Sequence, residues 1–359
     1  MADNIPQQKR GALGRFFRGL FKFLGVLILI LLVMEVALRI FGNYGQTTSY
    51  VPDQRLLWVP VPGRGLDVAT HVPVTISPDR FRYPVALGPK QPGQVRIFAF
   101  GDSVTQGWAA TDDGTYAADL QRILNSYHCP RVRFQGISAG VDAYSNAQVN
   151  DRLQVVFQDG FEPDIAIVAY SFNTEFENFT DLQGANRQAL LRRVWLKHYV
   201  RRSAVYEFTV EHLLRRFIYY KLRGKLVEGS WNVTKRKVAD TQRFYRELQQ
   251  SLATCRQHHA TMILLVLPSN QQRGNLDPMQ QTMLDFARNE NVPVVNIIDS
   301  WKDKDQVPLF VDHVHPSMAG HELIAEQLAA KIKSLGKIPC APAEPAPSVV
   351  ASSNLPGEP

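Results

Sequence analysis

The sequence predicts an α/β fold: a three-layer α/β/α, flavodoxin-like domain with a five-stranded parallel sheet, preceded by an N-terminal transmembrane helix and interrupted by a helical insert. Residues 164–170 form a near-continuous apolar run, which is typical of a strand buried on both faces. Shorter runs that suit strands lie at 95–100, 132–135, 262–267 and 292–296, and segments with helical periodicity separate them. Strands that alternate with helices favour a parallel sheet.

A long apolar run near the amino terminus predicts the transmembrane helix. Residues 1–22 form a basic, cytoplasmic amino terminus with five Lys or Arg residues against one acid. Residues 23–41 follow as the anchor. With the flanking apolar residues from Phe16 onward, the stretch reaches the length of about 20 residues that a bilayer requires. Basic residues ahead of an apolar run place that end in the cytoplasm.

A cleaved signal peptide has the same basic start and is the alternative to an anchor. Against it, the apolar run ends in Leu38-Arg39-Ile40-Phe41, which offers no small-residue cleavage site. A buried core helix fits poorly because nothing globular precedes the run. The expected location is therefore the bacterial inner membrane, crossed once, with the folded part in the periplasm.

The remaining segments differ in composition from the main domain, which is expected to cover 95–337. Residues 43–94 are rich in Pro and Gly and contain short strand-like pieces. They predict a β-rich lead-in, although a plain linker has the same composition. Residues 338–359 are rich in Pro, Ala and Ser, which predicts a disordered tail without a core.

The insert, at about 175–238, is too long for a simple crossover between strands and is strongly basic. Residues 187–246 hold 16 Lys or Arg residues against four acids, a net charge of +12, whereas the whole chain of 359 residues carries +7. Tyr206, Val210 and Phe217 recur at helical spacing, which indicates an amphipathic helical cap. Its basic side is either a solvated face or a surface for anionic lipid or an acidic polymer. Nucleic acid is not an expected partner, because the anchor places the domain away from it.

Composition argues against several other classes of protein. An apolar fraction of 45% is ordinary for a globular chain with a sizeable core. The sequence has no Gly-x-Gly-x-x-Gly and no P-loop, so no nucleotide cofactor is expected. The cysteines, Cys129, Cys255 and Cys340, allow at most one disulfide, and their spacing suits no zinc site. No metal is expected, and whether Cys129 and Cys255 pair stays open.

The candidate nucleophile lies in the heptapeptide from Gly101 to Gly107, Gly-Asp-Ser-Val-Thr-Gln-Gly. It follows the first predicted strand and precedes a helix expected to begin near Thr115. Glycines permit a tight turn, and the N-terminal end of a following helix favours a developing oxyanion. Ser103 at this turn is therefore a candidate nucleophile.

A possible acid and base for this serine lie far downstream. Asp312-His313-Val314-His315-Pro316 places a carboxylate and an imidazole three residues apart. On a tight turn Asp312 can hold one ring nitrogen of His315, which leaves the other nitrogen to take the serine proton. Pro316 suits the first turn of a final helix.

These motifs, in this order, resemble the SGNH or GDSL-type hydrolase family over about residues 95–335. The resemblance implies a serine esterase with Ser103 as nucleophile and with Asp312 and His315 as its partners. It also implies an oxyanion hole of the backbone N–H groups of Ser103 and Gly140 and the side-chain amide of Asn173. Ser103, Gly140 and Asn173 each follow a predicted strand, at the end of the sheet where ligands bind in such folds.

One part of the sequence departs from the family pattern. Where the family usually has Gly-x-Asn-Asp, this chain has Ser171-Phe172-Asn173-Thr174. Asn173 is retained, so its oxyanion role is expected to survive, while the shape of the loop is in doubt.

A second serine competes with Ser103 as the nucleophile. Gly136-Ile137-Ser138-Ala139-Gly140 is a literal Gly-x-Ser-x-Gly, the nucleophile elbow of α/β-hydrolases. Ser138 is the weaker candidate, because no His-Gly oxyanion motif lies upstream. In that other fold the acid and the histidine also usually come from separate loops.

The resulting prediction is a membrane-anchored serine esterase that cleaves acyl esters outside the cytoplasm. Acetyl groups on envelope polysaccharide and lipid acyl esters are both possible substrates. Two alternatives remain open: an O-acyltransferase acting on cell-envelope polysaccharide with the same triad, and a catalytically degenerate fold kept as an envelope interaction module. No residue identifies the ester, the oligomeric state, or the choice between water and an acceptor.

Overall fold

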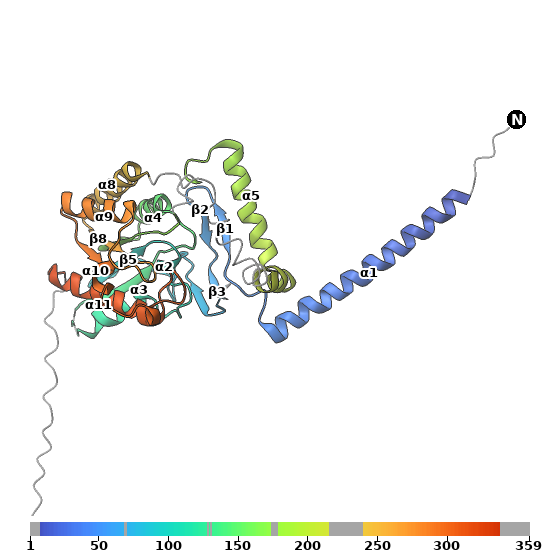
Figure 1. Cartoon of the computed structure of the whole chain (residues 1–359), viewed down its shortest axis with the longest axis horizontal. Helices are drawn as coiled ribbons and strands as arrows, with labels where there is room; N and C mark the ends of the chain where they lie inside the picture. The colour runs from blue at the N-terminus through green and yellow to red at the C-terminus, as the bar shows by residue number, and fades with distance from the viewer. Residues whose placement is uncertain are drawn as a thin grey trace, which may run out of the picture. The chain divides into compact units, whose positions relative to one another are not determined.

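The structure is a computed structural model that describes residues 8–67, 70–127, 129, 131–173, 179–214 and 240–337. The chain forms two compact units (Figure 1). The anchor unit combines residues 1–74 with residues 181–237, and the sheet unit combines residues 75–180 with residues 238–359. The predicted tail at 338–359 and two parts of the predicted insert, 175–178 and 215–238, lie outside the described residues.

The sheet unit contains a five-stranded parallel sheet with the strand order β6-β5-β7-β8-β9. In sequence order this is 2-1-3-4-5, the flavodoxin-like arrangement, so the predicted fold class is confirmed. The strands are β5 (Gln94–Phe100), β6 (Arg133–Ser138), β7 (Ile165–Ala169), β8 (Thr261–Val266) and β9 (Val294–Asn296). β6 continues three residues beyond the predicted strand end at 135, because Gly136, Ile137 and Ser138 pair with the end of β5.

Helices cover both faces of this sheet (Figure 1). One face carries α3 (Tyr116–Ser126) and α11 (Met318–Ser334), which pack against each other. The other carries α4 (Asn146–Gln158), α8 (Thr241–Gln257) and α9 (Pro278–Asn289). Short helical turns complete the unit: α2 (Ser103–Gln106), α10 (Ile297–Trp301) and η3 (Val307–Leu309).

Alternate residues of the central strands form the core under α3 and α11. Ile97 and Ala99 of β5 lie in one buried cluster with Leu120 of α3 and with Ile324 and Leu328 of α11. Burial of a side chain the size of Leu or Ile contributes about 1.5–3 kcal/mol relative to exposure. Because strand side chains alternate between faces, the neighbouring Phe98 faces the opposite layer.

The helices begin at residues that satisfy their first N–H groups. Ser145 and Gln148 form a capping box at the start of α4, and Asp277 and Gln280 form another at the start of α9. Pro278 occupies the first turn of α9, where the N–H that proline lacks has no partner within the helix. These local signals fix the strand-to-helix loops that surround the site.

The anchor unit contains the long amino-terminal helix and the first part of the insert. α1 (Gln8–Gly42) is followed by an antiparallel pair, β1 (Tyr50–Asp53) and β2 (Leu57–Pro60), on which α5 (Gly184–Arg201) packs. α6 (Ala204–Tyr206) and the π-helical η2 (Glu207–Leu214) come next along the chain. β3 (Gly63–Leu66) and β4 (Pro73–Ile76) form a further two-stranded sheet.

Within the described residues, α1 is the one helix long and apolar enough to cross a membrane. The qualifying stretch is Gly14–Gly42, with a mean hydropathy of 2.6, and its side chains are exposed along the apolar run. A membrane anchor and a signal sequence both have these properties.

The cysteines behave differently from one another. Cys129 is disulfide-bonded, whereas Cys255 is a buried free thiol on α8. The two therefore do not pair with each other. Burial raises the pKa of the Cys255 thiol to about 12, so this thiol is unreactive at neutral pH.

Candidate active site

All five residues predicted for the site lie in the sheet unit, around the carboxyl edge of the sheet. Ser103 follows β5, Gly140 follows β6 and Asn173 follows β7. Asp312 and His315 lie in the loop between η3 and α11. Parallel strands bring their carboxyl ends to one edge of a sheet, which is where ligands bind in open α/β folds.

A tight turn holds Ser103 at the start of α2. The Asp102 carboxylate caps this short helix by accepting from the Val104 N–H (2.9 Å). The turn closes at Gly107, whose φ of 88° is in the left-handed region that favours glycine. At Gly101 a Cβ atom would lie 2.0 Å from Thr105 Oγ1, so no larger residue fits there.

The structure brings Ser103, His315 and Asp312 into one hydrogen-bonded chain. Ser103 Oγ lies 2.8 Å from His315 Nε2, and His315 Nδ1 lies 2.8 Å from Asp312 Oδ2. The other carboxylate oxygen of Asp312 accepts from the backbone N–H groups of Val314 (2.9 Å) and His315 (2.8 Å). The turn therefore fixes the carboxylate, and the carboxylate fixes the ring.

These contacts keep the Asp312 carboxylate ionised. Burial alone would raise its pKa, but the hydrogen bonds from the side chain and backbone of His315 outweigh that effect and lower the pKa to about 2. An ionised Asp312 accepts a hydrogen bond from the Nδ1–H of His315, which leaves Nε2 of the neutral imidazole as the acceptor for the Ser103 hydroxyl proton.

Asn173 contacts the Ser103 turn by a hydrogen bond to Asp102. Asp102 Oδ2 accepts from the Phe172 N–H (3.0 Å) and from Asn173 Nδ2 (3.1 Å), and Nδ2 also donates to Tyr144 O (3.2 Å). Burial raises the pKa of the Asp102 carboxyl, although hydrogen bonds from the backbone N–H groups of Val104 and Phe172 oppose the shift. Both N–H groups of the Asn173 amide thus have a protein partner in this structure.

Ser171, the departure from the family pattern, is part of this arrangement. Its hydroxyl donates to Tyr144 O (2.5 Å) and accepts from the Asn173 N–H (3.1 Å). Its backbone N–H donates to Asn146 Oδ1 (2.9 Å). The serine side chain therefore holds the loop that carries Asn173.

Gly140 lies directly against the turn that follows Ser103. A Cβ at Gly140 would approach the Gln106 N atom to 2.4 Å and the Thr105 carbonyl carbon to 2.7 Å. The absence of a side chain lets the two backbone segments come together. Ala139 and Val141 on either side donate to Ala99 O and Gly101 O, which continues the β5–β6 pairing past the strand ends.

Ser138, the competing nucleophile, uses its hydroxyl in a buried hydrogen bond to the backbone. It is the last residue of β6, its side chain is buried, and its hydroxyl donates to Thr105 O (2.7 Å). Gly136 of the same motif packs against α3, where a Cβ would lie 2.0 Å from Ala117 O. This Gly-x-Ser-x-Gly is accordingly a strand end packed against a helix.

Two residues near the site were not singled out from the sequence. The Trp108 ring lies over the His315 ring, with centroids 4.3 Å apart and an interplanar angle of 31°. Arg82 is buried and donates to Gln106 O (3.0 Å) and Gly107 O (2.6 Å). Trp108 directly follows Gly107, the last residue of the Ser103 heptapeptide, so its position in the sequence could have indicated that it lies near the site. Arg82 binds carbonyl groups, which sequence patterns do not reveal.

His321 is a packing residue of α11 behind the site. It is fully buried against Tyr116, and its Nδ1 accepts from the Tyr116 N–H (3.3 Å). Burial, with the nearby positive charge of Arg82, lowers its pKa to about 3. The imidazole is therefore neutral in the folded protein.

This histidine predicts acid sensitivity of the fold. A folded-state pKa below the unfolded value of about 6.5 means that protons favour the unfolded chain. The contribution of His321 to stability is complete above that value and declines as the pH falls toward 3. In His321→Asn, which keeps an acceptor for the Tyr116 N–H, the unfolding free energy should fall less steeply below pH ~6.5, by up to about 1.4 kcal/mol per pH unit. Denaturant unfolding of both proteins at several pH values tests this, and equal slopes would contradict it.

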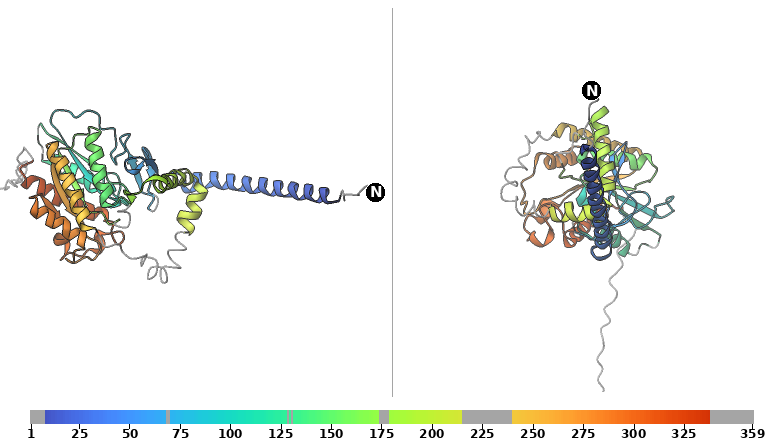
Figure 2. Two further views of the ribbon diagram at one scale, coloured as in Figure 1. Left: turned by 90° about the horizontal axis from the view of Figure 1, so that it is seen from above. Right: turned by 90° about the vertical axis from the view of Figure 1, so that its right-hand side faces the viewer.

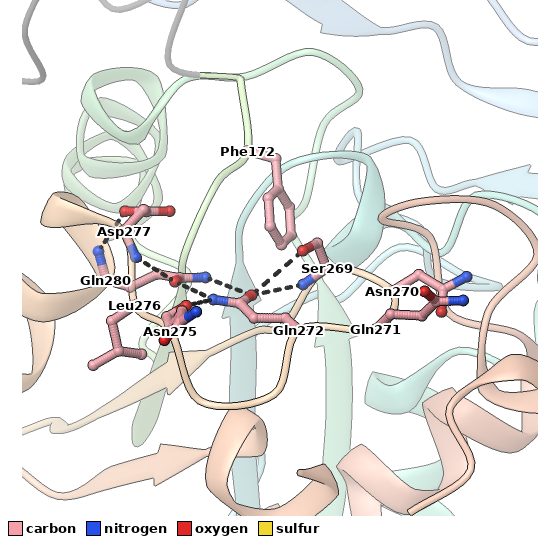
Figure 3. A pocket seen from close by; sticks show the side chains of 9 residues that line it. All are labelled: Phe172, Ser269, Asn270, Gln271, Gln272, Asn275, Leu276, Asp277 and Gln280. Carbon is pink, nitrogen blue, oxygen red and sulfur yellow. Dashed lines mark hydrogen bonds between the residues drawn. The ribbon is translucent and has the colours of Figure 1, made fainter.

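An open pocket of about 450 Å³ adjoins the Asp312–His315 loop (Figure 3). Asn270 on its rim donates through its backbone to His313 O (2.8 Å) and through Nδ2 to Asp312 O (3.2 Å). Phe172 forms another wall. Gln272 lies at the centre and is hydrogen-bonded to the Ser269 N–H and to the Gln280 side chain. Most of the lining is amide or hydroxyl: Ser269, Asn270, Gln271, Gln272, Asn275 and Gln280.

Comparison with solved structures finds lipolytic proteins and esterases at low sequence identity. The lipase/acylhydrolase from Enterococcus faecalis is 13% identical, with 70% of this chain and 100% of that chain covered and a TM-score of 0.42. The esterase EstA from Pseudoalteromonas sp. is 13% identical, with coverage of 67% and 98% and a TM-score of 0.40. A putative lipolytic protein of the G-D-S-L family from Desulfitobacterium hafniense is 14% identical, with coverage of 66% and 99% and a TM-score of 0.37.

Comparison of the sequence with protein families is decisive. No curated protein sequence matches the chain. The model of the GDSL-like Lipase/Acylhydrolase family matches residues 99–323, which is more than half of the chain and includes the Ser103 turn and the Asp312–His315 loop. The chain therefore belongs to the GDSL-like lipase/acylhydrolase family and is a serine hydrolase of the SGNH type.

Proposed function

We propose that this hydrolase is a membrane-anchored serine esterase in which Ser103, His315 and Asp312 form the catalytic triad. The observation that carries the proposal is the chain of two 2.8 Å contacts from Ser103 Oγ through the His315 ring to the Asp312 carboxylate. This is the arrangement of nucleophile, base and orienting group that acyl transfer requires.

The chemistry follows from the protonation states of these groups. Ser103 Oγ attacks the ester carbonyl carbon while His315 Nε2 takes the hydroxyl proton, and Asp312 stabilises the imidazolium that forms. The tetrahedral intermediate collapses as Nε2 gives the proton to the departing alkoxide. Water then attacks the acyl-serine with His315 again as base, which releases the carboxylic acid and restores Ser103.

The oxyanion is proposed to bind the backbone N–H groups of Ser103 and Gly140 and the Asn173 amide. Gly140 supports this role because its backbone lies against the Ser103 turn. The Asn173 amide can take part only if it exchanges its bond to Asp102 or to Tyr144 for one to the oxyanion. In that case the Asn173 amide would bind the transition state more strongly than the substrate, which is what catalysis requires of an oxyanion donor.

Asn173→Ala should lower kcat by about 10²- to 10³-fold with little change in KM, because one oxyanion donor is worth about 3–4 kcal/mol in the transition state. Steady-state kinetics on a soluble ester measure both constants. Asn289→Ala, an exposed asparagine at the end of α9, is the matched control and should behave as wild type. A rise in KM with unchanged kcat would place Asn173 in ground-state binding instead.

The pocket beside the site supports a polar ester substrate. Its amide and hydroxyl lining, with Phe172 as an apolar wall, suits a sugar ring better than a fatty acyl chain. We therefore propose short acyl esters, such as acetyl groups, on a glycan of the cell envelope. The same triad could also cleave a lipid ester, but that substrate requires an apolar channel for its acyl chain.

Contacts at the end of α1 support an anchor that is retained. Glu35 accepts from Ser203 Oγ (2.9 Å) and from the N–H groups of Ala204 (2.9 Å) and Val205 (3.0 Å). Cleavage after the apolar run would remove Glu35 from this unit. The disulfide at Cys129 supports an oxidising compartment outside the cytoplasm.

Turnover by the full chain in detergent tests the proposed function. Chromogenic esters of increasing acyl length and an acetylated oligosaccharide are offered in parallel, with and without prior treatment by an organophosphonate. We expect hydrolysis that favours the acetyl esters and that the phosphonate abolishes. Turnover that survives complete phosphonate treatment would contradict a serine nucleophile. Transfer of the acyl group to an added glycan in place of hydrolysis would identify an acyltransferase.

A further inference from the structure

The contacts of Glu35 tie the insert to the last turns of α1. Arg39, one turn after Glu35, binds the Glu35 carboxylate (2.6 Å) and donates to the Arg202 carbonyl. Just beyond α1, the Gly45 N–H donates to Glu207 (2.7 Å). The short helices after α5 are therefore held at the carboxyl end of α1, within one compact unit.

The length of α1 sets the depth of this junction, if α1 is the anchor proposed above. About 20 residues span the hydrocarbon layer, so a span that begins at Phe16, where the apolar stretch starts, ends at Glu35. Glu35 lies seven residues before Gly42, which is about 10 Å along a helix. The residues that bind Glu35 and Arg39 therefore lie at the depth of the membrane interface.

α5 leads directly into this junction, and it runs across the direction of α1 (Figures 1 and 2). One side of α5 packs on β1 and β2. Leu191 is buried there, and His198 Nδ1 lies 2.9 Å from Ser49 Oγ. In Figure 1, α5 lies between the β1–β2 pair on one side and the outgoing α1 on the other.

The exposed surface of α5 beside this packed side, which we call the α5 face, combines aromatic, aliphatic and basic residues. Arg192, Trp195, Leu196 and Tyr199 have the spacing of one helix face. Trp195 is 53% exposed, Leu196 56% and Tyr199 52%, and the rings of Trp195 and Tyr199 lie 4.7 Å apart. Between residues 184 and 202 the sequence has six Lys or Arg residues and no acid.

We propose that the α5 face lies on the outer surface of the membrane, with Trp195, Leu196 and Tyr199 in the interface and Arg192 and Arg193 against anionic phospholipid headgroups. Trp and Tyr favour the interface because their rings are apolar and their polar atoms remain hydrated. Basic residues gain from the negative surface potential, which acts within a Debye length of about 8 Å at physiological salt. An acidic glycan would use the charge but not the exposed Leu196 and Trp195, so lipid is the better occupant. This placement rests on α1 being a retained anchor.

Depth measurements on the full chain in vesicles test the placement. A spin label is attached at one of three exposed positions, through Leu196→Cys, Val26→Cys or Gln281→Cys. Val26 lies in the apolar run of α1, and Gln281 lies on α9 of the sheet unit. Vesicles contain a zwitterionic lipid with or without an anionic phospholipid. Collision rates with oxygen, which enters lipid, and with a water-soluble nickel complex report the depth of each label.

We expect the label at 196 to collide more with oxygen and less with nickel than the label at 281, and to lie shallower than the label at 26. Equal values at 196 and 281, with 26 deep in lipid, would overturn the α5 placement while leaving the anchor intact. A water-exposed label at 26 would instead refute the anchor, and the α5 placement with it.

The electrostatic part of the proposal has its own variant. Combined Arg192→Glu and Arg193→Glu should move the label at 196 toward the aqueous values of position 281 in anionic vesicles, and less so in zwitterionic vesicles. Hydrolysis of a soluble acetyl ester should stay within about twofold of wild type, because neither arginine belongs to the site. An unchanged depth at 196 in anionic vesicles would contradict a headgroup contact.

Discussion

Ser103→Ala should lower kcat/KM for ester hydrolysis by about 10⁵- to 10⁶-fold, the loss typical when a triad nucleophile is removed. The hydroxyl is the atom that attacks the ester, and the 2.8 Å contact to His315 Nε2 is its only route to deprotonation among the contacts at this turn. The remaining rate comes from the oxyanion donors and from substrate binding. Steady-state kinetics on a chromogenic acetyl ester measure the loss.

Ser138→Ala is the matched control for this substitution. The Ser138 hydroxyl donates to Thr105 O, so its removal loosens the turn near Ser103 and costs about 1 kcal/mol of stability. Activity should remain within about tenfold of wild type, since 1.4 kcal/mol in a barrier corresponds to a factor of ten. A larger loss in Ser138→Ala than in Ser103→Ala would reverse the assignment of the nucleophile.

His315→Ala should also lower kcat by about 10⁵- to 10⁶-fold, because the nucleophile and its base act as a unit. The imidazole receives the Ser103 proton at Nε2 and is held by Asp312 at Nδ1. Without it, no other base among the residues that the structure describes is hydrogen-bonded to Ser103, and the leaving alkoxide loses its proton donor. Single-turnover kinetics should show that formation of the acyl-enzyme is the step that slows.

The same loop supplies the control, His313→Ala. His313 is two residues earlier, its side chain is 80% exposed, and its ring lies no closer than 4.0 Å to the Asp312 carboxylate. The variant should keep kcat within about twofold of wild type, as expected of a surface substitution. If instead the His313 variant is inactive and the His315 variant is active, the catalytic base is His313 and the proposed triad is wrong.

The fold and the position of the site could be predicted because their signals are local. Most strands of the sheet are short apolar runs, and their alternation with helices favours a parallel sheet. Gly101, Gly107 and Ser103 mark a strand-to-helix turn by residue type alone, and the spacing of Asp312 and His315 fits a single turn.

The state of the Asn173 amide could not be predicted, because it depends on groups distant in the sequence. Its two bonds go to Asp102 and to Tyr144, which lie 71 and 29 residues away. The hydroxyl of Ser171 closes the same loop, so a residue that departs from the family pattern supports the loop geometry here. Only the folded chain shows that the departure is compensated.

The association of the insert with the amino-terminal helix was equally invisible in the sequence. Glu35 reads as a lone charge that interrupts an apolar run, and residues 202–205 lie about 170 positions later. Their hydrogen bonds join two segments that composition assigns to different parts of the chain. Arg82 is a similar case, because its partners include carbonyl groups of a turn distant in the sequence.

The measurement that tests the central claim most directly is the identification of the serine that carries a covalent organophosphonate. The wild-type full chain is labelled, digested with trypsin and analysed by mass spectrometry. Cleavage after Lys and Arg places Ser103 in the peptide 97–122, where it is the only serine, and places Ser138 in the separate peptide 134–152. The proposed triad predicts the label on Ser103 in the first peptide. A label in the second peptide, or one on Ser103 that persists at the wild-type rate in His315→Ala, would contradict it.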